Sequence, residues 1–194
     1  MSKRIKNLFF YKNFNLTKMS DKPLCCQHSE ILVGKSGKVS FGFGCVIHPK
    51  AKIIVEGDCS IIFGEYNIIE ENVTIKATPR YSALLNNEET VTVYIGNYNY
   101  FKVGAYLENT TVENFNEFDY KCHLQDLYVE SKSVINPGVF LAKGTNVKPN
   151  SIMLDNNQIV NNSNFNEIEF TKKIKELHKV LVNLLPKGNK IMPI

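Results

Sequence analysis

Large apolar residues recur at every sixth position through most of the chain. The longest run is Val129, Ile135, Leu141, Val147 and Met153, and shorter runs with the same spacing occur between residues 41 and 124. An amphipathic helix would space its apolar residues three and four apart, and a half-buried strand would space them two apart. A period of six fits neither element. It predicts a short strand and a turn, repeated many times.

The residues around each of these positions fit such a unit. A second apolar or small residue often precedes the key position by two, as do Val39, Cys45 and Ala51, and the residue that follows is often Gly, Asn or an acid. Gly, Asn and Asp suit tight corners because they tolerate left-handed backbone. Three units make a triangular coil of about eighteen residues, whose side chains stack on the next coil at about 4.8 Å. We therefore predict a mainly β chain, folded as a parallel β-helix of about six coils.

The same pattern divides the chain into parts. Residues 1–24 form a basic N-terminal extension without a clear period, and we regard it as a candidate for disorder. Residues 25–155 carry the repeats, which are interrupted by a predicted loop at 78–90. A polar linker follows at 156–166. The prediction is thus one β-helical domain with an inserted loop.

After the linker the apolar spacing becomes helical. From 167 to 185, residues such as Ile174, Leu177 and Leu181 share one stripe, lysines occupy other positions, and Pro186 ends the segment. A solenoid needs its flank or end covered. We expect this amphipathic C-terminal helix to pack on the β-helix of its own chain.

The net charge of +4 belongs to the N-terminal extension. Residues 1–20 carry five basic residues and no acid, which leaves the rest of the chain at −1 (4 − 5). A nearly neutral body argues against nucleic-acid binding, which needs a basic face. No segment is apolar over the length of a membrane span, so no membrane insertion is expected. A mitochondrial presequence is an alternative interpretation of the basic segment.

Cysteine usage points to a reducing compartment. The five cysteines are an odd number, they form no CxxC motif, and no secretory signal precedes them. We predict reduced and mostly buried thiols in a cytosolic protein.

The four histidines do not form the constellations of the known hexapeptide enzymes. A zinc site of the γ-carbonic anhydrase type needs three histidines. His48 and His123 are 75 residues apart, near four coils, and His178 lies on the predicted helix. Sharing a metal between chains of a trimer stays open. His28 precedes the first run of the period.

An acyltransferase would need a histidine base and a polar cradle for its substrate. His123, near Gln125 and Asp126, is the one candidate base within the repeats, and Arg80 is the one arginine there. A structural or exposed histidine is the better interpretation. We predict no catalytic, cofactor-binding or metal-binding residue and no cofactor. A γ-carbonic-anhydrase-like or acyltransferase-type homotrimeric enzyme is the alternative.

One part of the repeat region closely resembles a known family. The blocks VIHPKAKII at 46–54 and FGEYNIIEENVTI at 63–75 resemble the dynactin subunit 6 family. YIGNYNYFKVGAY at 94–106 and SVINPGVFLAKGTNVKPNSIML at 133–154 look like later blocks of that family, and KVLVNLLPK resembles its C-terminal helix. The resemblance covers about residues 26–190. The N-terminal extension departs from it, and the coils between Leu107 and Tyr128 match weakly.

The resemblance implies both a handedness and a role. It implies a left-handed coil, against the usual right-handed crossover rule. It also implies a non-catalytic scaffold subunit of the pointed-end complex of dynactin, which supports dynein-based transport along microtubules. The implied partners are a dynactin subunit 5-like β-helix and the actin-related protein of the pointed end, in the cytoplasm at the cytoskeleton. The exposed loop and the coil ends are the expected contact surfaces. Self-association of the isolated chain, for example as a trimer, stays open.

Overall fold

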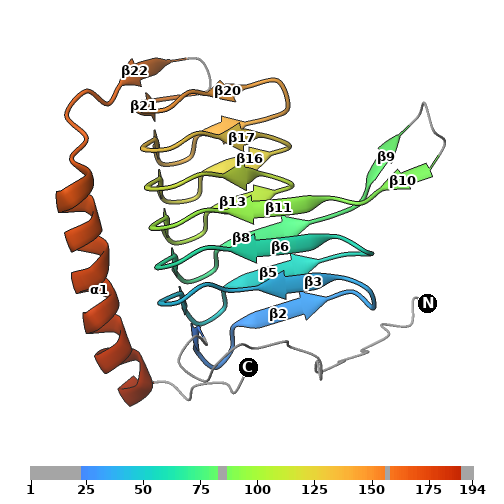
Figure 1. Ribbon diagram of the computed structural model, residues 1–194, viewed down its shortest axis with the longest axis horizontal. Coiled ribbons are helices and arrows are strands. Elements are labelled where there is room, and N and C mark those ends of the chain that lie inside the picture. Colours follow the sequence, from blue (N-terminus) through green and yellow to red (C-terminus); the bar gives the residue numbers. More distant parts are fainter. Residues whose placement is uncertain (1–22, 83–86, 156–157, 189–194) are drawn as a thin grey trace.

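The computed structural model describes residues 23–82, 87–155 and 158–188. Within these ranges the chain folds as a left-handed parallel β-helix, with helix α1 (Glu167–Gly188) packed along its side (Figure 1). The predicted fold class is therefore confirmed, including the handedness that the family resemblance implied. All but the last two residues of the predicted N-terminal extension lie outside the described residues.

Successive coils pair through three sheets, which form the three faces of a prism. The first face consists of β1 (Leu24–Cys25), β4 (Val46–Ile47), β7 (Ile68–Ile69), β12 (Tyr100–Phe101), β15 (Glu117–Phe118), β18 (Val134–Ile135), β21 (Ser151–Met153) and the antiparallel β22 (Ile159–Asn161). The second face consists of β2 (Glu30–Val33), β5 (Lys52–Val55), β8 (Thr74–Ala77), β13 (Tyr106–Glu108), β16 (His123–Gln125) and β19 (Phe140–Leu141). The third face consists of β3 (Lys38–Ser40), β6 (Ser60–Phe63), β11 (Thr92–Ile95), β14 (Thr111–Val112), β17 (Tyr128–Val129) and β20 (Asn146–Val147).

Inward side chains stack on one another because paired strands lie in register. Ile69 pairs with Ile47 in the coil before it and with Phe101 in the coil after it. Phe101 in turn stacks on Phe118, with ring centroids 4.8 Å apart, and both rings are fully buried. Burying each such side chain contributes about 1.5–3 kcal/mol. The core is thus built largely from the residues that recur with a period of six.

The coils differ in length, and the prediction of about eighteen residues per coil is wrong for the first ones. Val46 pairs with Ile68, 22 residues later, whereas Tyr100 pairs with Glu117, 17 residues later. The early strands β5 and β6 have four residues each, whereas β14 and β17 have two. A four-residue strand points two side chains inward with a period of two. This alternation is what breaks the period of six around residues 55–60.

Buried asparagines form a ladder at the corner before the first face. The backbone N–H of Asn99 donates to Asn67 Oδ1 at 3.1 Å, and that of Asn116 donates to Asn99 Oδ1 at 3.0 Å. The N–H of Ser133 continues the series with Asn116 Oδ1 at 2.8 Å. All four side chains are fully buried. Each carboxamide therefore satisfies a corner amide of the next coil, which would otherwise be buried without an acceptor.

Replacing Asn116 with alanine should destabilise the fold through this ladder. The substitution leaves the buried N–H of Ser133 without its acceptor, so we expect the free energy of unfolding to fall by about 1–3 kcal/mol. The control is Asn146→Ala, at an exposed position of β20, which should cost less than about 0.5 kcal/mol. Urea denaturation measures both variants, and equal losses would contradict the ladder's role.

Helix α1 covers the first face. Val46 and Ile68 lie outside the inner core but are fully buried, as is Ile174 of α1, and α1 contacts β4. Asn166 caps the helix by accepting two first-turn N–H groups at 3.1 and 3.2 Å. The helix continues to Gly188, three residues beyond its predicted end. No helix in the described ranges is long and apolar enough to cross a membrane.

An aromatic column along one corner of the prism also contacts the helix. Tyr66, Tyr98 and Phe115 stack at 5.2 and 5.4 Å. All three have positive φ values, between 53° and 61°, which is rare for bulky residues. Lys175 of α1 places its Nζ 5.4 and 5.7 Å from the centroids of the two tyrosine rings. The strained corners therefore present rings that the helix packs against.

Charged groups fix the helix on the same face. Glu117 lies between Lys102 of the prism and Lys173 of α1. The Nζ atoms of these lysines are 2.6 and 2.8 Å from the carboxylate oxygens of Glu117. Burial alone would raise the pKa of Glu117, but hydrogen bonds and charge from the two lysines outweigh it and hold this pKa below the ordinary value. The carboxylate thus links α1 to the body of the prism.

Acid should weaken this link. Because the pKa of Glu117 is lower in the folded chain than in the unfolded chain, its stabilisation is complete above the ordinary value of 4.5. The stabilisation is lost as the pH falls through the folded value. Glu117→Gln should therefore flatten the acid dependence of unfolding free energy between roughly pH 5 and 3. Glu176→Gln, at an exposed position of α1, should keep the wild-type dependence. An unchanged profile in Glu117→Gln would refute the link.

Candidate interaction surfaces

A hairpin arm (residues 78–91) projects from the corner between the second and third faces (Figure 1). It contains β9 (Arg80–Ser82) and β10 (Asn87–Glu89), which pair antiparallel with Arg80 opposite Glu89. The sequence predicted a loop over 78–90, and the structure instead forms two short strands there. Cross-strand hydrogen bonds satisfy backbone groups that a bare loop would leave to water. Residues 83–86 at its tip lie outside the description.

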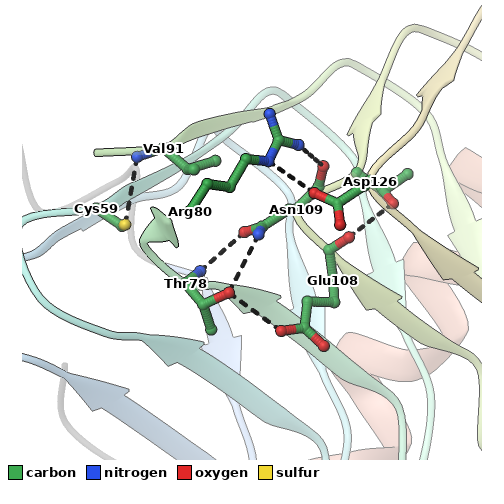
Figure 2. A network of polar contacts seen from close by, with 8 residues as sticks. Cys59, Thr78, Arg80, Val91, Glu108, Asn109 and Asp126 are labelled. Carbon is green, nitrogen blue, oxygen red and sulfur yellow. Dashed lines mark hydrogen bonds and ion pairs between the residues drawn. The ribbon is translucent and has the colours of Figure 1, made fainter. Parts of the chain in front are cut away.

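Polar contacts fasten the start of the arm to the neighbouring coil (Figure 2). The N–H of Thr78 donates to Asn109 Oδ1 at 2.8 Å, and Asn109 Nδ2 donates back to Thr78 Oγ1 at 3.1 Å. The Thr78 hydroxyl also donates to Glu108 Oε1 at 3.1 Å. At the other end of the arm, the Val91 N–H lies 3.3 Å from Cys59 Sγ. Both ends of the insertion are therefore held.

Arg80 extends this attachment across two coils (Figure 2). Its Nε donates to Asp126 Oδ1 at 2.6 Å, and its Nη2 donates to the backbone oxygen of Asn109 at 3.2 Å. Asn109 and Asp126 are both corner residues with positive φ, at 47° and 56°. Sequence reasoning considered Arg80 only as part of a substrate cradle. The structure shows that it contacts the turns under the arm.

The groove beneath the arm is polar and carries both signs of charge. It has a volume of about 480 Å³ and is lined by Arg80, Glu108, Asp126 and Lys143, among others. Burial alone would raise the pKa of Glu108, but hydrogen bonds from Tyr106 and Thr78 and nearby positive charge hold it below the ordinary value. With its main charges already paired, the groove serves to position the arm.

The second face carries paired charges on its first coils, and Leu32, Tyr106, His123 and Phe140 are also among its outward residues. Lys52 lies 3.5 Å from Glu30, and Lys76 lies 3.2 Å from Glu56 and 3.7 Å from Glu108. These pairs run from coil to coil along the outside of the sheet. Ladders of exposed ion pairs are typical of a face that stays in water.

The third face is different, because its outward side chains are almost uncharged. Ile62, Tyr94 and Tyr128 are 40%, 54% and 47% exposed. Tyr94 pairs with Ile62 of the coil before, and Thr111 lies between Tyr94 and Tyr128 in the same row, while Ser60 and Thr92 form the row beside it. Lys38, at one end, is the one charged residue among the outward positions of these strands. We call the row formed by Ile62, Tyr94 and Tyr128 the apolar ridge.

A shallow groove runs beside the apolar ridge. It has a volume of about 480 Å³ and is lined on one side by the ridge and on the other by corner residues that include Gly64, Gly96 and Asn114. Most of the surface lining it is apolar. The groove lies on the outer surface of the sheet, where outward side chains and corner residues form its walls. Grouped exposed apolar residues of this kind mark interaction surfaces.

Sequence comparison places the chain in a family. The dynactin subunit 6 of Dictyostelium discoideum is 30% identical over 166 residues, which are 84% of this chain and 77% of that protein. The chain belongs to the dynactin subunit 6 family. The subunit 6 proteins of Xenopus tropicalis and Nematostella vectensis are 33% and 37% identical, and the matches span 56% and 50% of their lengths. No protein-family model matches the chain.

A solved structure supports the fold of this family member. A hexapeptide transferase family protein from Anaplasma phagocytophilum superposes with a TM-score of 0.54 and 15% identity, over 81% of this chain and 97% of that one. At this level of identity the likeness concerns the fold alone. Fold does not determine activity, so the side chains must decide what the dynactin subunit 6 relative does.

His48, His123 and His178 lie in different parts of the fold. His123 stacks on Tyr106 at 4.4 Å on the second face, and His48 lies nearly buried with its Nδ1 3.0 Å from Glu71. His178 meets Tyr66 from α1 at 5.3 Å. Among the described residues, no group of three or more His, Cys, Asp or Glu could hold a metal. The absence of catalytic and metal-binding residues stays a prediction.

All five cysteines are free and buried, as the sequence predicted. Burial raises the pKa of Cys45 to about 11 and that of Cys122 to about 12. The thiolate is therefore scarce at neutral pH, and these cysteines behave as small core residues.

Arg80→Ala should loosen the arm without unfolding the prism. The Arg80–Asp126 pair is partly exposed, so we expect the free energy of global unfolding to fall by less than about 1 kcal/mol. Amide hydrogen exchange over residues 78–91 should accelerate, because the arm loses the contacts that Arg80 makes with the two neighbouring coils. Lys143→Ala, which lines the same groove, should leave the exchange unchanged. Equal exchange in Arg80→Ala and the wild type would contradict the anchoring role.

Proposed function

We propose that this chain is a non-catalytic, protein-binding subunit of a dynactin-type complex. Its membership of the dynactin subunit 6 family carries the proposal. The proposed partners are a second β-helical subunit resembling dynactin subunit 5 and the actin-related protein of the pointed end. In this role the chain would act in the cytoplasm, at the cytoskeleton, and support dynein-based transport along microtubules.

The three faces of the prism give this proposal physical support. The first face is covered by α1 and the second carries paired charges. The third face exposes Ile62, Tyr94 and Tyr128. Fully burying one large apolar side chain stabilises an association by about 1.5–3 kcal/mol. Aromatic residues with little charge around them are also typical of the buried centre of protein interfaces. An open third face is therefore suited to a partner subunit.

Affinity purification from the native cells tests the proposed function. The tagged chain, isolated under mild salt, should bring down a second β-helical subunit and an actin-related protein, identified by mass spectrometry. The tag alone, expressed at the same level, is the control. Recovery of neither partner would contradict the proposal. A homotrimer with one zinc per chain, found by metal analysis and light scattering, would favour an enzyme instead.

A further inference from the structure

We propose that the groove on the third face holds an amphipathic helix of a partner subunit, lying along the apolar ridge. This inference rests on the proposed function, since it assigns the surface by which the chain engages a partner. The bound helix would run across the coils and present an uncharged apolar stripe to Ile62, Tyr94 and Tyr128. The side of the bound helix that faces the corner residues of the groove would carry Lys or Arg.

The chain itself shows how such a helix binds. α1 runs across the coils of the first face (Figure 1) and buries Val46 and Ile68, which point outward from their strands. Lys173 on its flank reaches Glu117 at 2.8 Å. The first face of this prism thus already binds a helix in two ways. An apolar stripe packs against it, and a lysine of the helix forms an ion pair with an acidic residue of the face. The third face offers the same pair of features, and no helix of the described residues covers it.

The spacing of the ridge fits a helix. Ile62 and Tyr128 belong to coils three apart, so the ridge is about 14 Å long at about 4.8 Å per coil. About ten residues of helix cover that length at 1.5 Å per residue. Its residues at i, i+3 or i+4 and i+7 repeat every 5 Å or so, close to the coil spacing. Gly64 and Gly96 line the other side of the groove, and they are glycines because a Cβ at either position would collide with the next coil.

An extended strand of a partner is a weaker candidate for the ligand of this groove. β6, β11, β14 and β17 each have a neighbouring strand on both sides, so the backbone hydrogen bonds of the third face are made within the sheet. Strand addition needs a free edge. A ligand of this face must therefore bind through its side chains, as a helix does.

The corner beside the groove is acidic. Glu113 and Glu130 occupy equivalent positions of two successive coils, and Glu65 lies two coils before Glu113, with the coil of Gly96 and Asn97 between them. Glu113 accepts hydrogen bonds from the hydroxyls of Tyr128 and Ser131, while Lys148 lies 4.0 Å from Glu130. Among the described residues, no basic group lies within 4.0 Å of Glu65 or Glu113. A lysine or arginine on the flank of the helix would meet these carboxylates.

Site-specific crosslinking tests the identity of the occupant. The chain is reconstituted with the dynactin subunit 5-like protein and the actin-related protein of the same organism, with photoreactive benzoyl-phenylalanine in place of Tyr94. Mapped crosslinks should fall on a helical segment of a partner that has an apolar stripe and a basic flank. Crosslinks to a partner's β-helical coils, to a second copy of this chain, or none in an assembled complex would overturn the inference.

Charge substitutions provide a second, independent readout. Tyr94→Asp and Ile62→Asp should each weaken assembly at least about tenfold, because an unpaired charge would be buried against an apolar stripe. Phe140→Asp replaces an aromatic residue of matched exposure, 47%, on the second face and should assemble like the wild type. Circular dichroism confirms folding of each variant.

The two levels of the proposal fail differently. If the wild-type chain does not assemble with these subunits, the proposed function fails, and the helix site fails with it. If the wild type assembles and Tyr94→Asp assembles equally well, only the helix site is refuted.

Discussion

The structure depends on the backbone hydrogen bonds that join each coil to the next in strict register. Paired strands bring equivalent residues of successive coils to about the same place, one strand spacing apart. Like residues therefore stack on like: Phe101 on Phe118 in the core, Asn99 on Asn116 at a buried corner, and Tyr66 on Tyr98 outside. A polar group can be buried at a corner because the coil before it supplies the partner. The asparagine ladder is the clearest consequence of this constraint.

The same hydrogen bonds give each internal strand of the three faces a partner on both sides. What each face does is therefore decided by its outward side chains alone. Val46 and Ile68 make the first face a seat for α1, and pairs such as Lys52–Glu30 keep the second face in water. Within the described residues, the third face has neither a covering helix nor a charge ladder. The arm projects beside it, and Thr78 and Arg80 attach the start of the arm to neighbouring corners.

The sequence predicted the β-helix because a period of six has few other physical origins, and the family resemblance supplied its handedness. It did not predict the 22-residue coils. Inward residues such as Ile53 and Val55 are two positions apart. This spacing fits into a coil only if the strand has four residues. The role of Asn116 was also hidden, because a turn asparagine and a buried ladder asparagine look the same in sequence. Register decides between them, and register is a property of the whole stack.

The candidate surface was harder to find than the fold for a related reason. The sequence pointed to the loop and the coil ends, whereas the third face needs knowledge of which residues point outward together. Ile62, Tyr94 and Tyr128 are separated by 32 and 34 positions in the chain but share one ridge. The likeness to a hexapeptide transferase family protein concerns the fold alone, and a β-helical fold constrains the inward residues that build its coils. Outward residues are free of that constraint, so one prism can carry a catalytic site in one protein and a binding face in another. The ridge, and not the coil, is therefore where the function of this chain should be sought.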